Sequence, residues 1–196
     1  MNTLYTIGHS NMPIDEFIQL LKQYNIQIVC DVRSHPYSKY VPHFNAEALR
    51  NALLQHNIKY LYLGKELGPR STNPNHYIDG KVSYQLLEQS SQFQNGLQRL
   101  IKGIEQFTIA LLCSEKDPIN CHRAILICKN LPHDISIYHI LSDSSLESHQ
   151  DLEQRLVVTH FKDTATLFNT YNDLVPQAYI LQSKQLAYSA QTEEEE

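Results

Sequence analysis

Five residues that can do chemistry lie close together between positions 113 and 123. They are Cys113, Glu115, Cys121, His122 and Arg123. A cysteine at the start of a helix can lose its proton near neutral pH, so Cys121 or Cys113 can act as a nucleophile. His122 or Glu115 can transfer protons, and Arg123 can grip a phosphate or carboxylate through two parallel hydrogen bonds. Alternatively, His122 and Arg123 form a cap and satisfy carbonyl oxygens of the loop. The stretch therefore predicts a catalytic site for an anionic substrate.

The two cysteines also allow other interpretations. The spacing of Cys113 and Cys121 matches no standard zinc knuckle, and the spacing of Cys113 and Arg123 is not that of the cysteine phosphatases. A metal site would need a third and a fourth ligand, such as His9 or Glu115. The thiol pair can also oxidise to a disulfide, or both thiols can be inert and buried beside a turn. From the sequence alone we assign no metal ligand and no cofactor.

Further candidates follow the first apolar run of the chain. His9 comes directly after Gly8, which lets the backbone approach a ligand closely, and is a candidate general base or a structural, hydrogen-bonded histidine. Ser10 is a candidate substrate-binding residue. Arg70 and Tyr40, in two turn-rich loops, are further candidate substrate-binding residues. A loop aromatic such as Tyr40 can stack on a base or sugar above such a site, or it can simply pack as a lid.

Asp31, Arg33 and Ser34 end a second apolar run. Asp31 and Arg33 are two residues apart, so in a strand their side chains point to the same side. They either pair with each other, or they face a ligand, with Arg33 and Ser34 binding an anion and Asp31 acting as a base or as an acceptor for a ribose hydroxyl. Both interpretations stay open.

Hydrophobic periodicity predicts the elements that position these residues. Short apolar runs predict five strands, at 4–7, 26–32, 58–63, 109–112 and 135–140. Helical patterns occur at 14–24, 46–56 (with Asn45 as N-cap), 83–106 (one helix, or two with a break near 90–91 and 96), 124–131, 151–157 and 163–188. The irregular stretch 64–80 is long enough to expect a functional loop.

This alternation of strands and helices predicts an α/β, Rossmann-like domain. We expect a three-layer sandwich with a mostly parallel sheet of about five strands and helices on both faces. Ligands bind such sheets at the carboxyl ends of the strands, where all the candidate residues fall. We expect one domain over 1–190 and a disordered acidic tail over 191–196.

Composition limits the classes of partner that we expect this protein to bind and the compartment in which we expect it. The formal net charge is −5 at pH 7, and four of these charges belong to the terminal glutamates, so the body is nearly neutral and duplex DNA is an unlikely partner. No stretch has the length and apolar character of a signal peptide or a membrane span. Four scattered cysteines are typical of a reduced, cytoplasmic protein, and Cys30 and Cys128 lie in apolar runs as core residues. A homodimer is compatible with the sequence.

Several motifs together resemble the bacterial family named domain of unknown function DUF488. They are TIGHSN at 6–11, DVRS at 31–34 followed by P-x-S and P-x-F, LGPR at 67–70, CSEKDPINCHR at 113–123, YHI at 138–140 and QAYILQSKQLAY at 177–188. The resemblance covers nearly the whole chain and implies an α/β fold and a small cytosolic bacterial protein. The chain departs from the family pattern at Pro13, which replaces a polar helix cap, and at Pro69, which replaces a glycine. The family implies no activity.

The residue chemistry therefore leads to three functional hypotheses. The first is an enzyme acting on a small anionic or nucleotide-like substrate at the Cys/His/Arg site. The second is a non-catalytic module that binds nucleotides or single-stranded nucleic acid. The third is a metal or redox-thiol protein.

Overall fold

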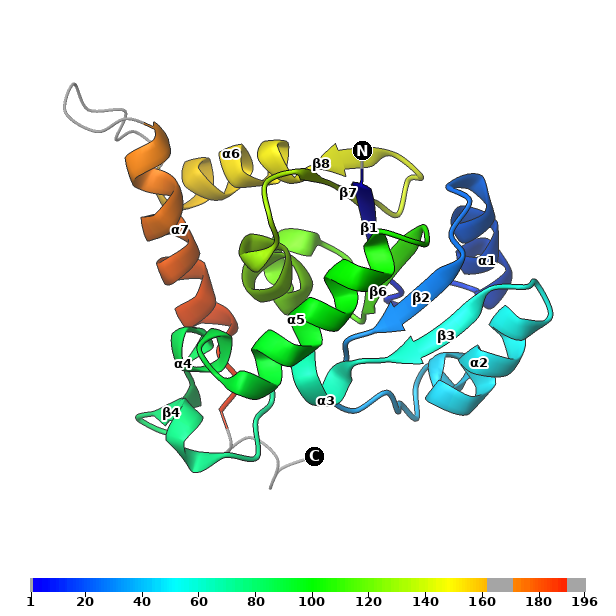
Figure 1. Ribbon diagram of the computed structural model, residues 1–196, viewed down its shortest axis with the longest axis horizontal. Helices are drawn as coiled ribbons and strands as arrows, with labels where there is room; N and C mark the ends of the chain where they lie inside the picture. The colour runs from blue at the N-terminus through cyan, green and yellow to red at the C-terminus, as the bar shows by residue number, and fades with distance from the viewer. Residues whose placement is uncertain (1, 162–170, 190–196) are drawn as a thin grey trace.

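A six-stranded sheet forms the centre of the computed structural model, which describes residues 2–161 and 171–189 (Figure 1). Its strands are β1 (Asn2–Gly8), β2 (Ile28–Asp31), β3 (Lys59–Tyr62), β6 (Ile109–Cys113), β7 (Ile135–Ile140) and β8 (Leu146–Ser148). They lie in the order β3-β2-β6-β1-β7-β8, and every neighbouring pair is parallel except β7 with β8. The expected mostly parallel sheet is confirmed. The expected acidic tail lies outside the described residues.

Helices cover both faces of the sheet. They are α1 (Ile14–Gln23), α2 (Ala46–Leu54), α3 (Gly64–Leu67), α4 (Tyr84–Glu88), α5 (Ser91–Ile104), α6 (His149–His160) and α7 (Tyr171–Leu186). Alternate residues of β6 divide between two cores, with Ala110 and Leu112 facing α1 and α2, and Leu111 and Cys113 facing α4, α5 and α7. This period of two explains why the strand is apolar throughout: both of its faces are buried.

The helix boundaries follow from local hydrogen bonds. The expected break near residues 90–91 is confirmed, because the hydroxyl of Ser90 caps the start of α5 by accepting from the amide of Phe93 at 3.2 Å. Gly96 causes no break; it lies inside α5, where an added Cβ would meet the side chain of Glu66 at 2.5 Å. Asn45 precedes α2 as expected but does not cap it, because its side chain accepts from the amide of Ser38 at 2.6 Å.

The expected α-helix at 124–131 is wrong. The chain forms a one-turn π-helix over Arg123–Ile127, followed by a 3-10 helix over Cys128–Asn130. Every residue of the π-helix is buried, so tertiary packing overrides the backbone preference for an α-helix. Such π-helical turns are rare and occur frequently at functional sites.

The sequence did not predict the shortest elements. These are the edge strand β8, the hairpin of β4 (Tyr77–Ile78) with β5 (Lys81–Val82), α3, and 3-10 helices at Pro42–Phe44, Pro74–His76 and Pro118–Asn120. The expected functional loop at 64–80 thus contains α3, a 3-10 helix and β4. The helix expected at 163–188 is α7 in its described part, and 163–170 lie outside the described residues. Among the described residues, no helix combines the length and apolarity that crossing a membrane requires.

Candidate metal centre

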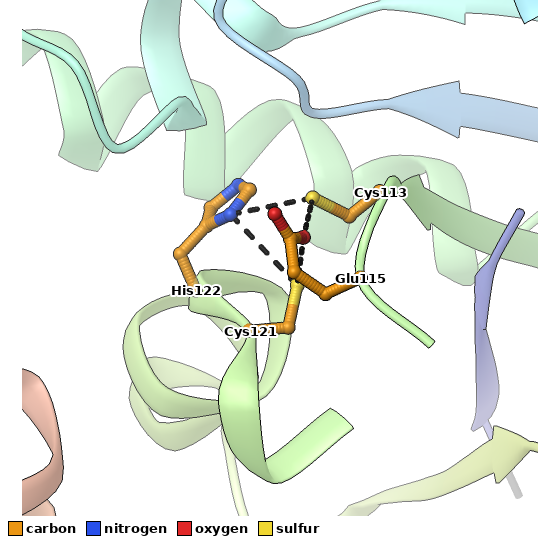
Figure 2. Close-up of side chains that lie close together, drawn as sticks. All are labelled: Cys113, Glu115, Cys121 and His122. Carbon is orange, nitrogen blue, oxygen red and sulfur yellow. Dashed lines mark hydrogen bonds between the residues drawn. The ribbon is translucent and has the colours of Figure 1, made fainter. Parts of the chain in front are cut away.

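Four of the predicted site residues form one cluster at the carboxyl end of β6 (Figure 2). Cys113 is the last residue of β6, Glu115 follows in the loop, and Cys121 and His122 lie between the 3-10 helix at 118–120 and the π-helix. One ligand atom from each side chain lies within 4.8 Å of all the others. The loop and the two short helices therefore fold back so that all four side chains converge.

Hydrogen bonds connect the members of this cluster. The thiols of Cys113 and Cys121 both donate to the same carboxylate oxygen, Oε2 of Glu115, at 2.7 and 3.1 Å. The two Sγ atoms lie 3.5 and 3.9 Å from Nδ1 of His122. Two sulfurs, one imidazole nitrogen and one carboxylate oxygen thus face a common centre.

The orientation of His122 suits it to be a ligand. Its Nε2 lies 3.0 Å from the backbone carbonyl oxygen of Val32, which can only accept, so Nε2 carries the proton. In the neutral ring Nδ1 then keeps its lone pair, which points at the sulfurs. Metal-binding histidines are usually held in this way, with the second ring nitrogen donating to a carbonyl or carboxylate.

Burial and charge set the proton affinities of the cluster. Burial raises the pKa of Cys121 well above its ordinary value, and the hydrogen bond with Cys113 adds to this effect. Burial alone would raise the pKa of Glu115, but the thiol hydrogen bonds and the charge of His122 outweigh it and lower that pKa. Burial alone would lower the pKa of His122, but the contact with Cys121 and the charge of Glu115 raise it. The cluster therefore favours a cation at its centre.

Arg123 holds the loop that carries Glu115. It is 0% exposed, and its guanidinium donates to the carbonyl oxygens of Glu115 and Lys116, at 2.7 and 3.2 Å, and to the hydroxyl of Thr6, at 3.2 Å. Gly8 packs against the same loop, since a Cβ on it would lie 1.8 Å from the Glu115 carbonyl oxygen. Of the two roles that the sequence allowed for Arg123, the structure shows the bonding to loop carbonyls, and the guanidinium is engaged with protein oxygens.

A second network contains the other predicted residues nearest the cluster. Arg33 makes a two-pronged ion pair with Asp31, at 2.9 and 2.6 Å, so the pairing interpretation of these two residues is the one the structure shows. Arg33 also donates to Nε2 of His9 at 3.0 Å, while Nδ1 of His9 donates to the carbonyl of Ser10 at 2.8 Å. Burial and the Arg33 charge lower the pKa of His9 to about 4. His9 is therefore neutral at pH 7, with both ring nitrogens engaged.

This second network touches the cluster through the backbone. The amide of His9 donates to the carbonyl of Cys113 at 3.0 Å, and Val32, the partner of His122, immediately precedes Arg33. The loops after β1, β2 and β6 therefore meet at one edge of the sheet, as the sequence predicted. Tyr60 was not predicted; its hydroxyl donates to Asp31 at 2.7 Å.

The remaining predicted residues lie apart from the cluster's ligand atoms. Ser34 accepts from the amide of Arg70 at 3.1 Å, and the Arg70 guanidinium stacks over the ring of Tyr188 at 4.5 Å. Tyr40 is 82% exposed, and its nearest charge is Lys39 at 5.1 Å from the ring. Ser10 adopts a left-handed backbone conformation, with a φ of 46°, and its amide donates to the carbonyl of Ser114. Ser10 thus contacts the loop of the cluster directly.

The fold and this cluster define an α/β protein with two cysteines, a histidine and a glutamate at the carboxyl edge of its sheet. The family model for the domain of unknown function DUF488 matches residues 13–129, more than half of the chain, so the protein belongs to this family. Neither the curated proteins nor the solved structures contain a match. The family has no described function, so function has to be argued from the site.

Proposed function

We propose that this protein is a zinc protein in which Cys113, Cys121, His122 and Glu115 bind one Zn²⁺ ion. The observation that carries the proposal is the convergence of four ligand atoms within 4.8 Å of one another. Around tetrahedral zinc, with bonds of about 2.0–2.3 Å, neighbouring ligand atoms lie about 3.3–3.8 Å apart. Small side-chain movements of the four residues would produce that geometry.

The kinds of coordinating atom in the cluster indicate which metal it would bind. Thiolates and imidazole favour zinc and other borderline or soft metals, whereas magnesium and calcium require oxygen ligands. A bound metal ion would take the place of the two thiol protons, which in this structure are donated to Glu115, and its charge would balance the two thiolates. The buried positions of Cys113, Cys121 and His122 also protect the thiolates from water and oxidants.

Glu115 is the member of the cluster that can exchange. As a whole residue Glu115 is exposed, although its carboxylate is partly buried against the thiols, while the other three residues are buried. Catalytic zinc sites typically keep three protein ligands and a fourth position that water or substrate occupies. We therefore propose an enzyme in which Cys113, Cys121 and His122 would keep hold of the metal while Glu115 gives way to a small anionic substrate. The bound metal would supply Lewis-acid polarisation of that substrate. Arg123 and Gly8 position the Glu115 loop in this mechanism.

The same contacts give less support to a cysteine nucleophile. A nucleophilic cysteine needs access and a lowered pKa, whereas Cys121 is 1% exposed and burial raises its pKa. Arg33 and Arg123, the expected anion ligands, are engaged with protein oxygens and with His9. For these reasons we place the substrate at the metal rather than at a thiolate.

The first test is a cobalt titration of the protein after chelator treatment. Binding of Co²⁺ at two thiolates gives strong charge-transfer absorption in the near ultraviolet, and we expect it to saturate at one equivalent. Cys121→Ala and His122→Ala should abolish tight binding, whereas Cys30→Ala, which removes an equally buried thiol outside the cluster, should leave it intact. Absence of thiolate bands, or equal binding by Cys121→Ala and Cys30→Ala, would contradict the metal site.

The second test asks whether Glu115 exchanges. In the cobalt form, azide should shift the visible absorption bands if it enters the coordination shell. We expect Glu115→Gln to retain one metal ion, with affinity lowered by about 10–100-fold, and to bind azide more tightly. Asp117→Asn changes a nearby carboxylate outside the cluster and is the control. Unshifted bands in both the wild type and Glu115→Gln would make the metal structural and would exclude the proposed enzyme.

A further inference from the structure

A second site lies away from the ligand residues of the metal cluster, between the β4–β5 hairpin with α4 on one side and α7 on the other (Figure 1). It is a cavity of about 520 Å³, and the π-helix contributes Ile125 to its wall. This volume is in the range of sites for small organic molecules. Segments that are far apart in the sequence build the cavity, so its shape depends on the folded tertiary structure.

The wall of the cavity is mostly apolar but contains one unused hydroxyl. Val82, Ile125 and Ile180 supply apolar surface. Tyr84 is 6% exposed, and its hydroxyl has no hydrogen bond to any residue that the structure describes. In the described part of the chain, every side-chain oxygen or nitrogen that is completely inaccessible to solvent has a hydrogen-bond partner. The Tyr84 hydroxyl has none among the described residues, so it must be at least partly accessible. A tyrosine hydroxyl is protonated at neutral pH, so that of Tyr84 can donate a hydrogen bond.

The charges around the cavity favour an anion. Lys81, Lys129 and Lys184 line it together with the acidic residues Asp79 and Glu88. Lys129 and Glu88 form an ion pair at 2.9 Å, which neutralises both. Lys81 and Lys184 have no ion-pair partner in the described part of the chain, so one net positive charge remains after Asp79 is counted.

We propose that this cavity binds an organic anion with an apolar body. The body packs against Val82, Ile125 and Ile180, a polar atom accepts a hydrogen bond from Tyr84, and the anionic group lies near Lys81 and Lys184. None of the four proposed metal ligands lines the cavity, although Tyr84 lies close enough to Cys113, Glu115 and Cys121 for their charges to act on it.

The test uses the fluorescent probe anilinonaphthalene sulfonate, which combines an aromatic body with one negative charge. We expect saturable binding of one probe per folded chain. Ile180→Glu places a carboxylate at the cavity and should weaken binding by at least about tenfold, because the charge must be desolvated beside an anion. Val158→Glu is the matched control, since Val158 is 64% exposed on α6 and does not line the cavity, whereas Ile180 is 54% exposed.

A second comparison tests the anionic character of the ligand. Lys184→Gln should weaken binding of the sulfonate probe several-fold and should not change binding of the neutral probe phenylnaphthylamine. Lys102→Gln, an exposed lysine outside the cavity, should affect neither probe. The proposal is overturned if Ile180→Glu binds the sulfonate as well as Val158→Glu does. It is also overturned if Lys184→Gln has no effect on the sulfonate.

Discussion

His122 and Arg123 are neighbours in the sequence but have different roles at the site. His122 presents a nitrogen lone pair to the two sulfurs, because its other ring nitrogen donates to Val32. Arg123 makes no hydrogen bond to the ligand atoms of Cys113, Glu115 or His122. It fixes the backbone of the loop that carries Glu115. Under the proposed metal site, the Cys-His-Arg string contributes two ligands followed by the residue that positions the loop of a third.

This positioning role can be tested with Arg123→Lys. An ammonium group cannot donate to three separated oxygens in the plane of a guanidinium, so buried carbonyls would lose their partners. We expect the free energy of unfolding to fall by about 2–4 kcal/mol and the affinity for Co²⁺ to fall with it. Arg99→Lys, at a half-exposed ion pair with Glu66, should change the stability by less than about 1 kcal/mol. Urea titration and cobalt titration measure the two effects, and equal behaviour of both variants would refute the role.

The sequence predicted all four residues of the cluster and the edge of the sheet where they lie, but not that these four side chains share one centre. His9, Arg33 and Cys113 each follow or end an apolar strand, so a parallel sheet necessarily brings them to one edge. The cysteine spacing matches no standard metal motif, and Glu115 reaches the two cysteines because its loop folds back against Arg123 and Gly8. Contacts of this kind depend on tertiary packing and leave no periodic signal in the sequence. Thr6 and Val32 were missed for the same reason.

At the scale of elements, a chain of hydrogen bonds connects β1, β7, α6 and α7. Thr6 bonds His139 at 2.8 Å, His139 bonds His149 at 3.0 Å, and His149 bonds the hydroxyl of Tyr179 at 3.0 Å. Tyr179 in turn donates to Glu153 at 3.0 Å. With both histidines neutral, every contact in the chain is satisfied when each ring accepts at Nδ1 and donates at Nε2.

This chain predicts that acid destabilises the fold. Burial lowers the pKa of His149 from 6.5 to about 4, so below about pH 6.5 the unfolded chain binds a proton that the folded chain does not. His149 therefore contributes stability that is complete above pH 6.5 and is lost as the pH falls toward 4. At pH 5 the loss is at most about 2 kcal/mol, since His149 is partly exposed. Burial also lowers the pKa of His139, in the same direction, whereas burial raises the pKa of Glu153 and opposes the effect.

Urea titrations at pH 7.5 and pH 5 measure this effect. His149→Gln should lose less stability between the two pH values than the wild type does, because it has no proton to take up there. His35→Gln, at an exposed histidine, should behave as the wild type. Wild type, His149→Gln and His35→Gln all retain the proposed metal centre. Any pH dependence of metal binding is therefore the same in all three and cancels when their losses of stability are compared. Equal losses in His149→Gln and wild type would show that the chain does not control acid stability.

The elements themselves were predicted unequally well from the sequence. The five parallel strands and helices α1, α2, α5 and α6 have enough apolar residues to show a period of two or 3.6. Strands β4, β5 and β8 have two or three residues each, too few to show a period, and pairing with a neighbour defines them. The π-helix after Cys121 has an apolar composition that also fits an α-helix. At its start, the side chain of His122 points toward the two sulfurs and that of Arg123 toward the backbone carbonyls of Glu115 and Lys116.

At the scale of the whole molecule, the proposed metal joins the edge of the sheet to the layer of helices beside it. Cys113 belongs to β6, while Cys121 and His122 belong to the turn that leads into the π-helix under α7. A ligand that binds only the folded chain stabilises it, by about 4 kcal/mol at 1,000 times its Kd. The metal therefore has a structural effect on the fold even where its role is to bind substrate.

X-ray absorption at the zinc edge, on protein purified without chelators, tests the central claim most directly. We predict one zinc per chain with two sulfur neighbours at about 2.3 Å and two nitrogen or oxygen neighbours at about 2.0 Å. Protein that purifies without metal, and gives no such spectrum after zinc is added, would contradict it. A bound zinc with only nitrogen and oxygen neighbours would contradict it equally, because Cys113 and Cys121 would then not be ligands.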